Sequence, residues 1–73
     1  KEIAADGDLM PLFEVIFQAG LCKSKSDARR TIEQGAVEVD EARVGDVKAE
    51  LSTKKALLIK VGKRRFAKVS FRR

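Results

Sequence analysis

Residues 11–44 read PLFEVIFQAGLCKSKSDARRTIEQGAVEVDEARV, and this stretch decides the fold. It predicts a short apolar helix, a capped basic helix and a strand, joined by very few connecting residues. Ser24 stands three residues before Asp27, which is typical of a capping box, so we expect a helix to begin near Lys25. Gly35 supplies the left-handed residue that commonly ends such a helix.

Basic side chains gather at the positive end of this second helix. Ala28 and Ile32 fall on one side, whereas the lysine and arginines project from other faces. Exposed cations beside a helix N-terminus oppose the macrodipole by roughly 0.3–1 kcal/mol each. A bound phosphate would remove that conflict, because helix amides and basic side chains would converge on it. The alternative is a solvated basic face that Asp27 and Glu33 partly compensate. The candidate binding residues in this group are Lys23, Ser24, Lys25, Ser26, Arg29 and Arg30.

A first helix is expected over residues 9–19, with Asp8 as its cap and Pro11 in the first turn, where a missing amide is tolerated. Its buried stripe would be Leu12, Val15, Ile16 and Ala19, and Gly20 would end it. Phe13 and Phe17 form a neighbouring stripe, which makes the apolar face of this helix broader than the small domain can cover. We therefore expect one of the two rings to pack in the core and the other to meet a neighbouring domain.

The rest of the chain alternates short apolar runs with turn residues. We expect strands at 37–39, 43–44, 47–51, 57–61 and 65–71, with turns at Asp40-Glu41, Gly45-Asp46 and Gly62-Lys63-Arg64. The prediction is an α+β fold, in which two N-terminal helices pack on a small, mostly antiparallel sheet of four or five short strands. Residues 1–8 are expected to form a linker or frayed lead-in that packs little, and residues 9–73 a single domain.

Composition excludes most enzyme chemistry. The 73 residues allow one domain, and they contain no Trp, Tyr or His. No spacing among the eleven acids suggests a convergent pair, so we expect no catalytic residue, metal or cofactor in this chain. Cys22 is the single cysteine, which excludes an internal disulfide and indicates a reducing compartment. We expect the cytoplasm, with the mitochondrial matrix as the alternative, and no membrane span, since no apolar run approaches the ~20 residues of a span. We also expect no membrane partner, because the basic residues are not paired with an amphipathic helix that bears a continuous exposed apolar stripe.

Charge is strongly segregated along the chain. Residues 1–53 hold seven Lys and Arg against eleven acids, whereas residues 54–73 hold nine bases and no acid. Such a segment on a folded module indicates a polyanionic partner, nucleic acid first and an anionic membrane second. Lysines on a terminal hairpin also discourage strand aggregation, which is the alternative reading of this cluster. Phe66 beside the cluster could stack on an unpaired base or point into the core. The candidate binding residues here are Lys60, Lys63, Arg64 and Arg65.

Residues 12–44 resemble the small RNA-binding domain first described in the fourth protein of the small ribosomal subunit. The residues that carry the resemblance are Leu12, Ala19-Gly20-Leu21, Ser24-Lys25, Ala28-Arg29, Ile32, Gly35, Val37 and Val39-Asp40. Farther along, Leu57-Leu58-Ile59 and Gly62-Lys63-Arg64-Arg65-Phe66 resemble the closing basic hairpin in the C-terminal domain of bacterial and mitochondrial-type tyrosyl-tRNA synthetases. The chain departs from the family in two places: Asp40-Glu41 replaces a common Asn-Gly, and Phe66 replaces a common Tyr.

The resemblance implies an RNA-binding appendage that clamps the long variable arm or adjacent stem of tyrosine tRNA. In such a parent, a separate catalytic domain activates tyrosine with ATP, and we expect a homodimeric parent and a monomeric isolated fragment. The alternatives are a related RNA-binding domain of a ribosomal, rRNA-modifying or stress protein and, more distantly, a domain that docks on an anionic membrane or a protein. Because the candidate residues are Lys and Arg, we expect recognition of phosphates and RNA shape.

Overall fold

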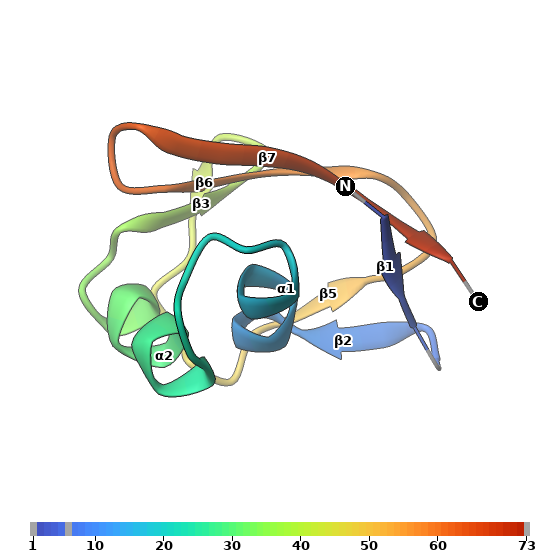
Figure 1. Ribbon diagram of the computed structural model, residues 1–73, viewed down its shortest axis with the longest axis horizontal. Coiled ribbons are helices and arrows are strands. Elements are labelled where there is room, and N and C mark those ends of the chain that lie inside the picture. The colour runs from blue at the N-terminus through green and yellow to red at the C-terminus, as the bar shows by residue number, and fades with distance from the viewer. Residues whose placement is uncertain (1, 6, 73) are drawn as a thin grey trace.

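The computed structural model describes residues 2–5 and 7–72, which form two layers: two helices lie against one face of a sheet (Figure 1). Residues 1, 6 and 73, which the expected lead-in and domain include, lie outside the described residues. The elements in chain order are β1 (Glu2–Ala4), β2 (Leu9–Pro11), α1 (Leu12–Gln18), α2 (Lys25–Glu33), β3 (Val37–Val39), β4 (Ala42–Arg43), β5 (Glu50–Ser52), β6 (Leu57–Val61) and β7 (Arg65–Arg72).

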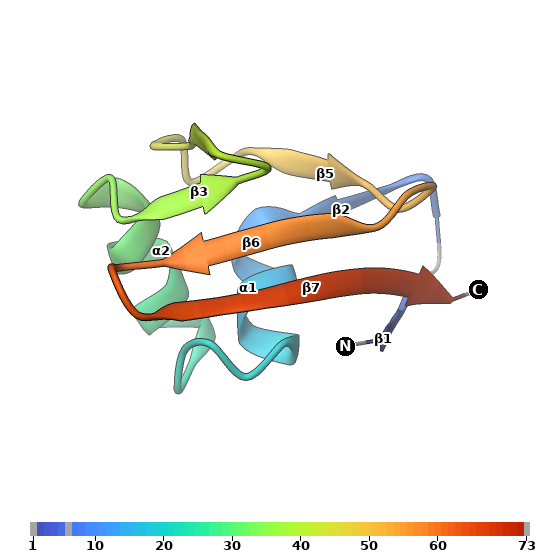
Figure 2. The same ribbon diagram turned by 90° about the horizontal axis from the view of Figure 1, so that it is seen from above.

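The main sheet has five strands in the order β1-β7-β6-β3-β4 (Figure 2). The pairs of β7 with β6, β6 with β3 and β3 with β4 are antiparallel, and only β1 pairs in parallel, with the end of β7. Strands β2 and β5 form a separate antiparallel pair. The predicted α+β class, with two helices on a mostly antiparallel sheet, is confirmed.

The core lies between the helices and the inner face of the sheet. Strand β6 alternates buried Leu57, Ile59 and Val61 with residues that face away from the helices, and β7 contributes buried Val69. The expected stripe of the first helix is confirmed, because its four members are between 0 and 7% exposed. The largest fully buried side chains are Leu12, Val15, Ile16, Ile32, Val37, Ile59 and Val69.

The first helix is shorter than predicted. It begins at Leu12, and its N-cap is Pro11, with φ −58° and ψ 137°, in place of Asp8. The three residues expected as its first turn form β2, where Leu9 pairs with Ser52. Tertiary pairing with β5 therefore overrides the helical pattern at this end. The amide of Leu12 donates to the carbonyl of Ala49 at 2.9 Å, which extends that pairing to the first residue of the helix.

The expectation that residues 1–8 pack little is wrong for residues 2–5. Ile3 is 2% exposed within the core, and the amide of Ala5 donates to the carbonyl of Arg72 at 2.8 Å. Three residues are too few to show the alternating pattern of a strand in the sequence. Strand β1 forms by pairing with the edge backbone groups at the end of β7.

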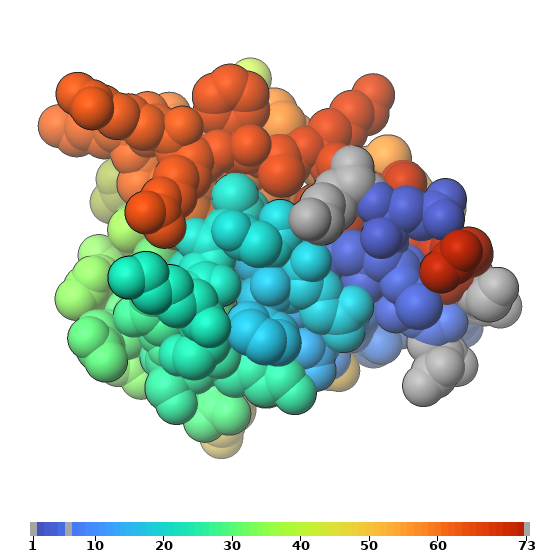
Figure 3. Space-filling view, in the orientation of Figure 1, coloured from blue at the N-terminus to red at the C-terminus, as the bar shows by residue number. Residues whose placement is uncertain are grey.

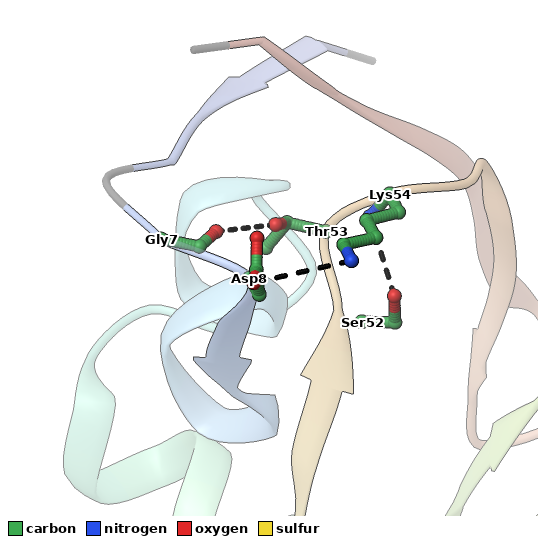
Figure 4. A network of polar contacts seen from close by, with 5 residues as sticks. All are labelled: Gly7, Asp8, Ser52, Thr53 and Lys54. Carbon is green, nitrogen blue, oxygen red and sulfur yellow. Dashed lines mark hydrogen bonds and ion pairs between the residues drawn. The ribbon is translucent and has the colours of Figure 1, made fainter.

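A polar network fixes the chain just after this strand (Figure 4). The Thr53 hydroxyl donates to the Gly7 carbonyl, the Thr53 amide donates to the Asp8 carbonyl at 2.9 Å, and Lys54 Nζ lies 3.9 Å from Asp8 Oδ2. Thr53 is 7% exposed. The expected lead-in is therefore attached to the domain along residues 2–5 and 7–8. A linker role toward a longer chain stays a prediction.

The turn at Asp40-Glu41 forms as predicted, with both residues in the left-handed region, at φ 50° and 73°. A two-residue hairpin with both positions left-handed matches the twist of its strands, and this explains why Asn-Gly is preferred there. Asp40 compensates for its conformation, because its amide donates to the Leu58 carbonyl at 2.8 Å and its Oδ1 accepts from the Leu58 amide at 2.9 Å. Glu41 is exposed.

Glu41→Gly should therefore raise the free energy of unfolding by about 0.5–1 kcal/mol. A residue with a Cβ atom costs about 1–2 kcal/mol in the left-handed conformation, and glycine avoids this cost. The greater conformational freedom of glycine in the unfolded chain offsets about 0.5–1 kcal/mol of that gain. Urea denaturation measures the change. The matched control is Glu41→Ala, which removes the charge but keeps Cβ, and equal stabilisation by the alanine would contradict the conformational explanation.

Candidate nucleic-acid interface

The first group of candidate residues surrounds the start of α2. Ser24 is extended, with φ −153° and ψ 167°, and its hydroxyl accepts from the Asp27 amide at 3.1 Å. The predicted cap and helix start are thus confirmed, and the Ser24 hydroxyl satisfies one of the four amides that a helix leaves free. All six members of this helix group are exposed: Lys23, Ser24, Lys25, Ser26, Arg29 and Arg30.

Helix α1 orients two of these cations. Lys25 Nζ lies 3.0 Å from Glu14 Oε1, and the Arg29 guanidinium carbon lies 4.7 Å from the centre of the Phe13 ring. Phe13 is half-buried and packs against the core, so the guanidinium sits on a ring that the core itself holds in place. The contribution of Glu14 and Phe13 was not predicted from the sequence, because it depends on how the two helices pack.

The structure distinguishes the two phenylalanines of α1. Phe13 is the one that packs against the core, whereas Phe17 is 37% exposed. Cys22 is buried at 9% exposure, and its thiol lies 3.9 Å from the Thr31 hydroxyl, which in turn donates to the Asp27 carbonyl at 2.8 Å. The thiol thus packs beside α2.

The second group lies on the β6–β7 hairpin. Residues 62–64 form the connection, with Gly62 at φ 69° and its amide donating to the Ala36 carbonyl at 2.8 Å. Lys63 and Arg64 are exposed in this connection. Arg65 opens β7 opposite Val61, a residue of the inner face, and its Nη1 donates to the Leu21 carbonyl at 3.1 Å.

Arg65 attaches the hairpin to the loop between the helices. Figure 3 shows the hairpin residues resting on that loop, and Figures 1 and 2 show the hairpin connection at the same end of the molecule as α2. Leu21, which accepts from Arg65, lies two residues before Lys23. Arg65 thus brings the start of β7 to the loop before the helix group, whereas Gly62 and Lys63 lie beside residues 34–36, which follow the end of α2.

Lys60 does not join this arrangement. Side chains alternate along β6, so Lys60 faces away from the helices, and it pairs with Glu38 on one side and Phe66 on the other. It is half-buried. The structure thus divides the predicted hairpin residues between two faces of the sheet, because a strand presents successive side chains to opposite sides.

Over residues 2–5 and 7–72, no three side chains among His, Cys, Asp and Glu gather in a way that would hold a metal ion. Neither helix in this part of the chain is long and apolar enough to cross a membrane.

Comparison with known families gives a match over residues 2–69 to the tyrosine–tRNA ligase SYY-like C-terminal domain. The tyrosine–tRNA ligase of Geobacter sulfurreducens is 41% identical over 69 residues, covering 94% of this chain and 17% of the relative. Those of Carboxydothermus hydrogenoformans and Aromatoleum aromaticum are 45% and 46% identical over 67 residues, covering 90% and 92% of this chain and 16% of each relative. The chain thus spans about a sixth of the length of these relatives.

Arg65→Met should lower the free energy of unfolding by about 1 kcal/mol, because it keeps the apolar stem but removes the hydrogen bond to Leu21. Lys63→Met in the hairpin connection is the matched control and should change stability by less than about 0.5 kcal/mol. Thermal and urea unfolding measure both. Equal effects of the two substitutions would mean that Arg65 does not tie the hairpin to the loop.

Proposed function

The chain belongs to the SYY-like C-terminal domain family of tyrosine–tRNA ligases, and from this premise we propose that it is the tRNA-binding appendage of such a ligase. The helix group and the hairpin connection grip the phosphates of one RNA. A separate catalytic domain of the longer chain, in a homodimeric cytoplasmic ligase, activates tyrosine. The long variable arm of tyrosine tRNA, or its adjacent stem, is the proposed ligand.

The observation that carries this proposal is that exposed cations of two distant segments flank α2, the helix group at its start and the hairpin connection beside the residues that follow it. The principal extents of the described chain are 30 × 21 × 20 Å, so the two groups are no farther apart than a short stretch of RNA helix can span. A single RNA helix can therefore reach both groups. Repulsion among the exposed cations falls when phosphates approach, and this supports an anionic ligand over a solvated face.

The chemistry of the groups favours shape over sequence. Lys and Arg are the main side chains that contact phosphates, whereas Asn and Gln pair with adenine edges and aromatic side chains stack on bases. None of the latter types occurs among the helix group or at residues 62–65. The appendage therefore adds affinity and orientation, and it leaves the choice of nucleotide to the geometry of the tRNA and to other parts of the ligase.

Affinity for a tRNA with a long variable arm should fall steeply with salt. Four phosphate contacts at about 0.7–0.9 released counterions each give a slope of about −3 for log K against log salt. Fluorescence anisotropy with labelled tRNA over a salt series measures it. A slope near zero would overturn the electrostatic account.

Lys63→Glu combined with Arg64→Glu should reduce tRNA affinity by at least about tenfold, and Arg29→Ala alone by about 1–3 kcal/mol. When it is added to the charge reversal, Arg29→Ala should reduce the binding free energy by less than it does alone, because an RNA that has lost contact with one group also binds the other group more weakly. A double-mutant cycle measures this coupling. Strict additivity would mean two independent sites, and undiminished binding by the hairpin variant would remove the hairpin from the interface.

A further inference from the structure

The outer face of the main sheet carries no helix in the described chain, because both helices pack on the opposite face (Figure 1). On β6 and β7 the inward positions are filled by Leu57, Ile59 and Val69, which are 0 to 4% exposed. The alternate positions face outward. We call the outward residues at the centre of this face the outer-sheet patch: Leu58, Lys60, Phe66 and Lys68.

Phe66 is the centre of this patch and is 68% exposed, the highest fraction among the large hydrophobic side chains of the described residues. Lys60 lies directly opposite it on β6, and Lys68 lies two residues along β7 on the same face, opposite Leu58. Directly opposed side chains have Cβ atoms about 4.5–5.5 Å apart. A solvent-exposed aromatic ring thus lies beside two lysines, and Leu58, which is 42% exposed, adds a second apolar side chain to this surface.

Packing within the fold does not explain the two exposed apolar side chains of this patch, Leu58 and Phe66. Strand β6 is paired on both sides, so neither exposed Leu58 nor half-buried Lys60 protects a sheet edge. Phe66 contributes nothing to the core from this face, contrary to the inward alternative left open by the sequence. An exposed aromatic ring also promotes association, which is the opposite of what protection requires.

Charge identifies the kind of occupant. The patch contains two lysines and no acid, and residues 54–73 contain no acid at all. Glu38 lies directly opposite Lys60 on β3, and these two residues line a hollow together with Glu41 and Leu58. The β7 side of the patch is therefore basic and its β3 side is acidic, so an anionic ligand would lie along β7. Two copies of this chain would place lysine against lysine on this face.

We propose that the outer-sheet patch binds an unpaired stretch of RNA, with one base stacked on Phe66 and the neighbouring phosphates held by Lys60 and Lys68. Stacking on an aromatic side chain between cations is how proteins hold single strands without reading sequence. A duplex keeps its bases stacked on each other, so it offers no free base to the ring. This inference rests on the proposed function in that the ligand is RNA, but it uses the opposite face of the sheet.

The test uses a tryptophan placed at the ring position. The chain has no tryptophan, so Phe66→Trp introduces a single fluorophore. Titration with hexa-adenylate should quench its fluorescence, whereas a 12-base-pair RNA duplex at equal phosphate concentration should not. Leu9→Trp, at a 58% exposed position on β2, is the matched control and should respond to neither, because Leu9 belongs neither to the outer-sheet patch nor to the two cation groups. Absence of quenching by the single strand, or equal quenching by the duplex, would overturn the proposal.

Affinity variants separate this site from the helix side. Phe66→Leu keeps an apolar β-strand residue and should weaken hexa-adenylate binding by about tenfold, since one stacked base is worth that much or more. Circular dichroism checks that the variant stays folded. If Phe66→Leu has no effect while Lys63→Glu with Arg64→Glu abolishes tRNA binding, the outer-sheet site is wrong and the proposed function stands.

If hexa-adenylate binds and depends on Phe66 while tRNA binding is indifferent to the hairpin charges, the outer-sheet site stands and the proposed tRNA interface fails. In a third titration, vesicles of phosphatidylserine and phosphatidylcholine are added to the Phe66→Trp variant. A change in the fluorescence of the Phe66→Trp variant with these vesicles, and none with hexa-adenylate, would assign the patch to a membrane and overturn the RNA proposal.

Discussion

Burial of one face of β6 against the two helices is the constraint on which the rest of this structure depends. Ile59 at the middle of that strand is 0% exposed, and β6 is paired with β3 on one side and with β7 on the other. A slip of one residue would move every buried side chain to the solvent. The register that protects Ile59 therefore also fixes where the hairpin connection lies and which lysines face outward.

A second dependence runs through Arg65, which the same register places on the inner face. Its hydrogen bond to Leu21 connects the hairpin to the loop that leads into α2. The exposed ion pair of Lys25 with Glu14 adds little stability by itself, since pairs of this kind are worth about 0–1 kcal/mol. Its effect is geometrical: like the contact of Arg29 with Phe13, it limits where a flexible cation can reach.

The two faces of the domain have different chemistry because successive side chains of each strand point to opposite sides of the sheet. On the helix side, cations stand around a helix end and a hairpin connection, where they can follow a phosphate backbone. On the outer side of the sheet, strand alternation places an aromatic ring and two lysines on the same face. A small domain has few residues to spare for its core, so each strand contributes one side to packing and leaves the other for contact with a ligand.

The sequence by itself determined the local elements. The Ser24 cap, the apolar stripe of α1, strand 57–61 and the Asp40-Glu41 turn follow from neighbours close in the chain, and local geometry is enough to define them. Tertiary structure alone decided the start of α1, the pairing of Ile3 beside β7, the separation of Lys60 from the helix group and the outward position of Phe66. These depend on which strand lies beside which, and that is set by contacts between residues far apart in sequence, where local propensity carries no information.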